Sequence, residues 1–231
     1  HRGALQADGV TFTSMDSTNY RWDGIFLYEY LTDSISYIKN CDISYGDVGI
    51  FVQNNDSLDI SNNTIRTSGD AGVRVSGWGG PHIINNKFVG NNHGVLGEVA
   101  AIPLITGNLF KNNTGHSVHT YPNVIRGNIY GNTYEDNAQQ YIHVVEDNSY
   151  LNEDMIYFWL KDGAPYYITG DVYVRDVTDA SVIKTPILNI ETGTTLLFGD
   201  NASIRVNDTG EGHHRGALQA DGVTFTSMDS T

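Results

Sequence analysis

The sequence predicts an all-β fold, a right-handed parallel β-helix (β-solenoid) with coils of about 20 to 25 residues and an internal asparagine ladder. Three observations favour this fold. Two columns of apolar residues recur along the chain with the same period, asparagine-rich turns interrupt the first column, and Gly usually introduces the second. Repeats of this length are typical of solenoids, in which each coil covers its neighbour.

The first column lies in five segments that share one pattern, with an apolar residue at each end and a polar turn between. These are residues 38–43, 60–65, 83–88, 105–110 and 125–130. Their first residues are 22, 23, 22 and 20 positions apart. We therefore expect one tight turn at the same place in every coil.

The second column holds one β-branched residue in each coil. Its members are 25, 23, 22, 23 and 24 positions apart: Ile25, Ile50, Val73, Val95, Val118 and Ile142. Strands of about three to five residues cannot bury a face alone, so their stability must come from stacking on the next coil. The strands should pair in parallel, with backbone hydrogen bonds along the axis.

The fourth position of the first pattern predicts the ladder. It holds four asparagines and one cysteine: Cys41, Asn63, Asn86, Asn108 and Asn128. An amide offers both donors and an acceptor, so successive side chains can bond along the axis and satisfy the backbone of a tight turn. Cys41 should end this ladder as a buried thiol, because no catalytic pattern accompanies it.

The chain divides into three parts on this interpretation. Residues 1–145 form regular coils, residues 146–165 form an aromatic-rich excursion where the pattern lapses, and residues 166–231 form further coils. The last part should lead into another unit of the same kind.

A second, longer repeat supports that continuation. Residues 1–18 recur without a change as residues 214–231, an offset of 213 positions. Chance does not produce so long an identity. An artificial overlap is the alternative explanation, but a tandem repeat with a unit of 213 residues is the interpretation we favour.

Composition limits the partners. The chain has 231 residues and a formal net charge of -14, from 27 acids and 13 bases. This charge repels phosphate backbones and anionic lipids, so nucleic acid and membrane surfaces are poor partners, whereas cations or neutral sugars fit better. No apolar run is long enough to insert into a membrane, and the first residues lack the layout of a signal peptide, so the chain is mature or a fragment.

We expect an extracellular or cell-surface location. One cysteine excludes an internal disulfide framework but leaves the compartment open. Five Asn-x-Ser/Thr triplets are candidates for N-glycosylation: Asn55, Asn62, Asn112, Asn201 and Asn207.

The residues also resemble a known superfamily. Residues 216–227, 22–27, 41–46 and 60–65 resemble right-handed parallel β-helix repeat proteins of the pectate-lyase-like and NosD-like kind, including tandem-repeat microbial surface proteins. The resemblance covers most of the chain except about residues 146–165. It implies the fold and leaves the activity open, since the superfamily holds polysaccharide lyases and hydrolases, phage tailspikes, adhesins and a copper-maturation protein.

Catalytic patterns are weak. A glycosidase needs two acids at a defined separation, but the acids here fall in different columns: Asp42, Asp47, Asp56, Asp59, Asp70, Glu98, Glu135 and Asp136. The motif set of polygalacturonase-like enzymes is missing. The bases that a lyase would use follow no selective spacing: Lys39, Arg74, Lys87, Lys111 and Arg126.

Histidines form the more informative group. His119 and His143 each follow a residue of the second column, so both should point outward on coils about 4.8 Å apart. His93 and His116 should lie near the same edge. Such a group suits Zn²⁺ or Cu²⁺, although a repeat also aligns surface histidines without any metal.

Exposed aromatic residues are expected to cover the solenoid or to make contacts with sugars or other subunits: Tyr20, Trp22, Tyr28 and Tyr30.

The sequence therefore favours a passive building block, one unit of an extracellular filament, stalk or sheath made of tandem β-helical modules. Its partners would be neighbouring copies of itself, with glycans as a further expectation and no cofactor. The alternative is a carbohydrate-binding or polysaccharide-cleaving surface protein of the same fold.

Overall fold

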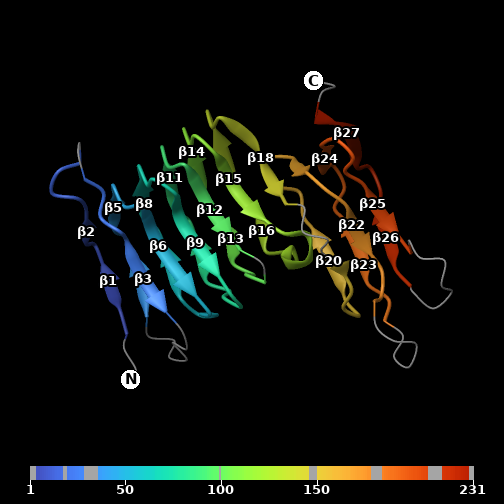
Figure 1. Ribbon diagram of the computed structural model, residues 1–231, viewed down its shortest axis with the longest axis horizontal. Helices are drawn as coiled ribbons and strands as arrows, with labels where there is room; N and C mark the ends of the chain where they lie inside the picture. The colour runs from blue at the N-terminus through green and yellow to red at the C-terminus, as the bar shows by residue number, and fades with distance from the viewer. Residues whose placement is uncertain are drawn as a thin grey trace.

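The computed structural model describes residues 4–17, 20–28, 36–98, 100–145, 150–177, 184–207 and 215–228. In Figure 1 the strands follow one another along the long axis, with β1 (Gln6–Asp8) near one end and β26 (Ala217–Ala220) near the other. The described residues contain 27 strands and one short 3-10 helix, η1 (Pro122–Val124). Three strands in succession make one coil, so the described residues make nine coils.

Two sheets are confined to the first six coils. Sheet 1 has the order β1 (Gln6–Asp8), β4 (Tyr37–Lys39), β7 (Asp59–Ser61), β10 (His82–Ile84), β13 (Leu104–Thr106) and β16 (Ile129–Tyr130). Sheet 2 has the order β2 (Thr11–Phe12), β5 (Asp42–Ser44), β8 (Thr64–Arg66), β11 (Lys87–Val89), β14 (Leu109–Lys111) and β17 (Thr133–Glu135).

Sheet 3 runs through all nine coils. Its order is β3 (Ile25–Tyr28), β6 (Val48–Gln53), β9 (Ala71–Ser76), β12 (His93–Gly97), β15 (His116–Thr120), β18 (Gln139–Val144), β21 (Tyr166–Ile168), β24 (Thr195–Phe198) and β27 (Thr224–Ser227).

Two further sheets complete the last three coils. Sheet 4 has the order β19 (Tyr150–Leu151), β22 (Val172–Val174) and β25 (Ile204–Val206). Sheet 5 has the order β20 (Ile156–Trp159), β23 (Ile187–Ile190) and β26 (Ala217–Ala220). Strands of neighbouring coils pair in parallel, so the fold is the predicted parallel β-helix.

The predicted apolar columns are in register. Ile38, Ile60 and Ile83 are paired directly between coils in sheet 1, and the second column is paired in the same way in sheet 3. A further column in sheet 2 brings Phe88 against Phe110, with ring centroids 5.0 Å apart and an interplanar angle of 9°. Each side chain is therefore buried largely by its counterpart one coil away.

Glycines in sheet 3 face this aromatic column across the core. A Cβ on Gly94 would lie 2.5 Å from Phe110 Cδ1 and 2.5 Å from the Ser117 carbonyl oxygen. A Cβ on Gly72 would meet Phe88 in the same way. The Gly that introduces Val73 and the Gly that introduces Val95 are thus required by close packing of the core.

The asparagine ladder lies at the turn between sheets 1 and 2. Asn86 Nδ2 donates to the Ile60 carbonyl at 2.8 Å and to Asn108 Oδ1 at 3.1 Å, while Asn86 Oδ1 accepts from the Asn63 backbone N–H at 2.9 Å. The Asn63 side chain makes the equivalent bonds one coil earlier. Cys41 ends the ladder: it is buried and free, and its Sγ lies 3.0 Å from the Lys39 carbonyl.

The prediction for Asn128 is wrong, because Asn132 is the next member of the ladder. Asn108 donates its backbone N–H and its Nδ2 to Asn132 Oδ1 at 3.0 and 3.1 Å. Asn128 instead donates to the Pro103 carbonyl and accepts from the Arg126 backbone N–H. The connection that contains η1 is four residues longer than the pattern assumed, so Ile129 pairs with Ile105 in the first column.

A second ladder lies at the turn between sheets 2 and 3, and the sequence analysis missed it. Asn91 and Asn113 each donate a backbone N–H to the amide oxygen one coil further on, at 3.0 and 2.9 Å. Asn137 is the last of these asparagines, and Ser68 donates its N–H to the first. Ser68, Asn91, Asn113 and Asn137 are 23, 22 and 24 positions apart. This regular spacing is the feature of the sequence that predicts the second ladder.

The predicted aromatic excursion is also wrong where the structure describes it, from residue 150 onward. β19 pairs with β22 and β20 pairs with β23, so this segment belongs to the coils. Tyr157 and Trp159 are fully buried in the core. Large aromatic side chains replace aliphatic ones here, and this replacement hid the period.

The cross-section changes at the same point. Sheet 2 ends with β17, and Asp162 takes the ladder position, accepting from the Asn132 backbone N–H at 2.7 Å and from its Nδ2 at 2.9 Å. The Gly127 N–H donates to the Phe158 carbonyl, which places β20 above the segment that leads into β16. Sheet 5 thus continues the wall that sheet 1 began.

Replacement of Gly94 by Ala should destabilise the fold by about 1 to 3 kcal/mol, because the added methyl group overpacks against Phe110 and a backbone oxygen. Gly97→Ala in the same strand is the matched control, since its Cβ would meet only the His119 carbonyl, at 3.3 Å. Urea unfolding measures both free energies. Equal effects would contradict the packing argument.

Asn132→Ala should cost about 2 to 4 kcal/mol, because it leaves buried backbone groups without partners, whereas Asn128→Ala should cost about 1 kcal/mol. Asn132 has four hydrogen bonds in the ladder and Asn128 has two at a partly buried site. Calorimetric melting of the two variants decides between the two assignments. A larger loss for Asn128→Ala would restore the original one.

Candidate functional site

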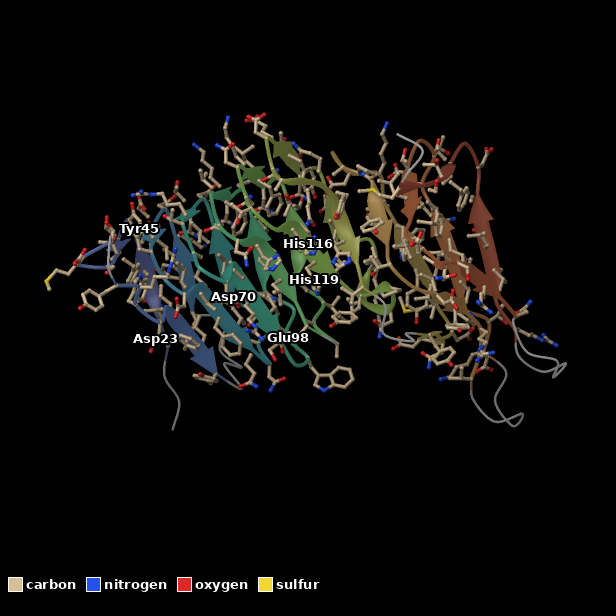
Figure 2. The ribbon with its side chains drawn as sticks, turned by 45° about the horizontal axis from the view of Figure 1, so that its top comes forward. Asp23, Tyr45, Asp70, Glu98, His116 and His119 are labelled. Carbon is tan, nitrogen blue, oxygen red and sulfur yellow. The ribbon has the colours of Figure 1, made fainter. Side chains whose placement is uncertain are left out.

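Four histidines gather on the outer face of sheet 3. His93 lies on β12, His116 and His119 on β15, and His143 on β18. His119 and His143 are directly paired between adjacent coils. Figure 2 shows His116 and His119 beside each other near the middle of the solenoid, with Asp70 and Glu98 toward its N-terminal side.

His116 lies on the same side of the coil as His119, although residues three apart on a regular strand point to opposite faces. In β15 both intervening residues, Ser117 and Val118, are buried, and the two histidines lie outside them. The preceding strand β12 has the same burial pattern. The register shift between β15 and β18 places its extra residue in β18. One strand therefore contributes two side chains to this cluster.

Three of these histidines approach closely enough to share a ligand. Each of His116, His119 and His143 offers a ring nitrogen within 4.8 Å of the other two. The Nδ1 atoms of His119 and His143 are 3.1 Å apart. The rings of His116 and His143 stack with centroids 4.1 Å apart. We call these three residues the histidine cluster.

His93 has a different role. The backbone N–H of His116 donates to His93 Nδ1 at 3.0 Å. Because a neutral imidazole has one acceptor nitrogen, this bond uses the lone pair of His93 and leaves its Nε2 protonated. His93 therefore supports the backbone of His116.

The histidine cluster is neutral at pH 7. Burial, with a smaller contribution from neighbouring histidines, lowers the pKa of His116 and of His119 from 6.5 to about 4. The same causes lower the pKa of His143 to about 3. Neutral imidazoles keep a lone pair on one ring nitrogen.

Polar and aromatic groups surround the cluster. His143 Nε2 lies 3.3 Å from Thr169 Oγ1, and Tyr141 and Tyr167 contact the rings from the C-terminal side. On the N-terminal side Arg74 binds both Asp70 and Glu98. That guanidinium neutralises both carboxylates, and the cluster itself presents nitrogen ligands.

The candidate catalytic acids are dispersed over different sheets and turns. Five of them form ion pairs with a lysine or arginine: Asp42, Asp59, Asp70, Glu98 and Glu135. Four of the candidate bases are the partners in ion pairs: Lys39, Arg74, Lys111 and Arg126. These contacts are typical of charged surfaces that link adjacent coils.

The candidate glycosylation sites differ in accessibility. Asn55 is 2% exposed, and its Oδ1 accepts from the Ser57 and Leu58 backbone N–H groups, so it caps a turn and is closed to a glycan in the folded chain. The other four lie in exposed turns with positive φ: Asn62, Asn112, Asn201 and Asn207.

The aromatic contact candidates also divide. Tyr20 and Tyr28 are exposed, whereas the Trp22 indole is partly buried and donates to the Ser44 carbonyl at 2.8 Å. Tyr30 lies outside the described residues. Trp78 is highly exposed, and the sequence analysis did not single it out.

Concave sites lie on the C-terminal coils, and two of them are described by their lining. A cavity of about 210 Å³ lies beside the turn at residues 161–165. A wider groove of about 430 Å³ crosses sheet 5, and its lining includes Phe158, Asn189 and Gln219. Neither contains the histidine cluster. In the described part of the chain no helix has the length and apolar character needed to cross a bilayer.

Comparison with known proteins gives one match. The sequence model of a family described as right handed beta helix region matches residues 2–154. No curated protein and no solved structure matches the chain.

Acid should destabilise the chain below pH 6.5 because the histidine cluster binds protons less readily when folded. The unfolded chain, with ordinary histidine pKa values, takes up protons first as the pH falls, which favours unfolding, so the stabilisation is complete above pH 6.5 and is lost toward pH 4. We expect a loss on the order of 2 kcal/mol between pH 7 and pH 5, after allowance for solvent screening.

Urea unfolding at each pH, with a chelator present, measures this loss. His143→Gln should reduce it, and the exposed His82→Gln should leave it unchanged. If His143→Gln has the same pH dependence as the parent, the assignment of the loss to the cluster is refuted.

Proposed function

The chain belongs to the right-handed β-helix family, and from this premise we propose that it is a structural repeat unit of an extracellular filament, stalk or sheath built from tandem β-helical modules. The observation that carries the proposal is the duplicated segment. Its two copies adopt the same local structure at opposite ends of the solenoid.

Each copy is a strand, a tight turn and a second strand. The first copy forms β1 and β2 around Gly9, with φ 66°, and the second forms β26 and β27 around Gly222, with φ 62°. A positive φ at this turn favours Gly. The same sequence therefore keeps its conformation while its neighbours differ.

The two copies use complementary edges. In the first copy Ala7 pairs with Ile38 and Phe12 pairs with Ile43, both on the following coil. In the second copy the equivalent Ala220 and Phe225 pair with the preceding coil. A segment inside a tandem chain would make both sets of contacts at once.

Hydrogen bonds at the turn support the same join. The Gly9 N–H donates to the Lys39 carbonyl of the following coil, and the Gly222 carbonyl accepts from the Gly193 N–H of the preceding coil. A single glycine residue can make both bonds, one through its N–H and the other through its carbonyl. Apolar contacts agree, because Phe225 is 47% exposed whereas Phe12 is partly buried under its following coil.

At each junction, a sheet of one unit would continue as a differently numbered sheet of the next unit. The second copy adds β26 to sheet 5 and β27 to sheet 3, whereas the first copy begins sheets 1 and 2. Sheets 5 and 3 of one unit thus lead into sheets 1 and 2 of the next. The next strand along the chain, the equivalent of β3, would then stack on sheet 4, since the order of walls around the coil is kept.

This arrangement gives a rigid rod. Sheet 3 spans nine strands, and eight spacings of about 4.8 Å give an axial rise of about 40 Å per unit. Continuation also covers strand edges that would otherwise pair with other chains. Exposed turns at Asn62 and Asn112 leave room for glycans along the rod.

Carbohydrate binding is the second candidate function, and the groove over sheet 5 favours it. Phe158 is partly exposed there beside amide side chains. An exposed aromatic ring next to hydrogen-bonding groups is suited to stacking on a sugar. This activity would add to the structural role without replacing it.

Electron microscopy of chains with one, two and four consecutive units should show straight rods that lengthen by about 40 Å per unit. Ala220→Asp at a junction should introduce a bend or a break, because that side chain would be enclosed between Ile190 and the equivalent of Ile38. Met15→Asp, within the same repeated segment but fully exposed, is the control. Flexibly linked particles in the unmodified chains would contradict the proposal.

A further inference from the structure

The structure assigns a second property to the chain that is independent of the filament. We propose that His116, His119 and His143 form a binding site for a divalent transition-metal ion of the zinc and copper class. The geometry of the three rings, the orientation of their nitrogens and their neighbours all support this site.

The donor spacing fits a small coordination sphere. In a tetrahedral complex with metal–nitrogen bonds near 2.0–2.1 Å, two ligand nitrogens lie about 3.3 Å apart. The Nδ1 atoms of His119 and His143 are 3.1 Å apart. His116 offers its nitrogen within 4.8 Å of both, so a rotation of its ring brings three donors around one ion.

The hydrogen bonds of His143 direct its lone pair to the centre of the cluster. Thr169 donates its hydroxyl proton to the Val144 carbonyl at 3.3 Å, so its Oγ1 accepts from His143 Nε2. The proton of His143 therefore lies on Nε2, and Nδ1 is left as an acceptor that faces His119. A hydrogen-bonded second nitrogen is the usual support of a metal-binding histidine.

His116 and His119 complete the set. His116 Nδ1 is buried and has no hydrogen-bond partner, which is costly for a polar atom; a metal ion would satisfy it. His119 reaches the ion through Nδ1 when its proton moves to Nε2, so the neutral ring changes tautomer and no proton is lost. His93 fixes the backbone of His116 through the bond to its N–H.

The chemistry of the donors selects the ion. Three neutral imidazoles suit Zn²⁺ and Cu²⁺, with copper bound more tightly, whereas Ca²⁺ and Mg²⁺ require oxygen ligands. Asp70 and Glu98, on the N-terminal side of the cluster, are held by Arg74. Because the pKa values of the three histidines are lowered, their lone pairs are free at neutral pH. Three protein ligands leave a fourth position open to water or another donor.

Calorimetric titration of the chain with Zn²⁺ and with Cu²⁺ at pH 7 tests the site. We expect one ion per chain and tighter binding of Cu²⁺. His119→Ala or His143→Ala should weaken binding on the order of 100-fold, which is the upper end of the 10- to 100-fold range seen for loss of supporting groups. His82→Ala, which removes an exposed histidine on sheet 1, should leave the affinity unchanged.

Melting curves with and without zinc test the site even if a variant is less stable, because each variant is compared with itself. Zinc should raise the melting temperature of the parent and of His82→Ala, since an ion that binds only the folded chain stabilises it. The same zinc concentration should not raise that of His143→Gln, which preserves side-chain volume and can still accept a hydrogen bond. Bound Co²⁺ should give the visible absorption of a four-coordinate site in the parent.

Two results would overturn the site. One is the absence of saturable binding to the parent. The other is equal affinity in the parent and in both cluster variants, which would show that the rings only stack and that metal binds elsewhere.

Discussion

Everything in this fold depends on the stacking of one coil on the next in register. A coil has strands of two to six residues, so it has no interior of its own, and each buried side chain is covered by its counterpart about 4.8 Å away. The backbone bonds and the asparagine ladders point along the same axis. Stacking in register therefore buries the apolar side chains, gives the buried polar groups their hydrogen-bond partners and pairs the strands, all at once.

This condition explains which parts of the fold the sequence predicts. Aliphatic columns such as Ile38, Ile60 and Ile83 are visible because register requires the same kind of residue at a fixed interval. Asn128 was misassigned because residues 125–130 and 129–134 fit the same pattern. The choice between them depends on the length of the connection that contains η1, and that length follows from contacts with the next coil.

Other features escaped because they depend on packing across the coil. Tyr157 and Trp159 occupy core positions where the pattern expects aliphatic residues, since the cross-section is rebuilt after sheet 2 ends. The outward positions of His119 and His143 follow directly from the period, and the sequence also places His116 near the same edge. The close approach of the His116 ring depends on two consecutive buried residues, Ser117 and Val118, which interrupt the alternation by which sequence analysis assigns faces.

Register also links the two proposals. Sheet 3 carries the histidine cluster and is the only sheet that extends through all nine described coils. In a tandem chain the cluster would recur once per unit, at intervals of about 40 Å along the rod. An ion bound between β15 and β18 would join two adjacent coils through their side chains, close to the point where sheet 2 ends. Metal would therefore reinforce the part of each unit where one wall of the solenoid gives way to another.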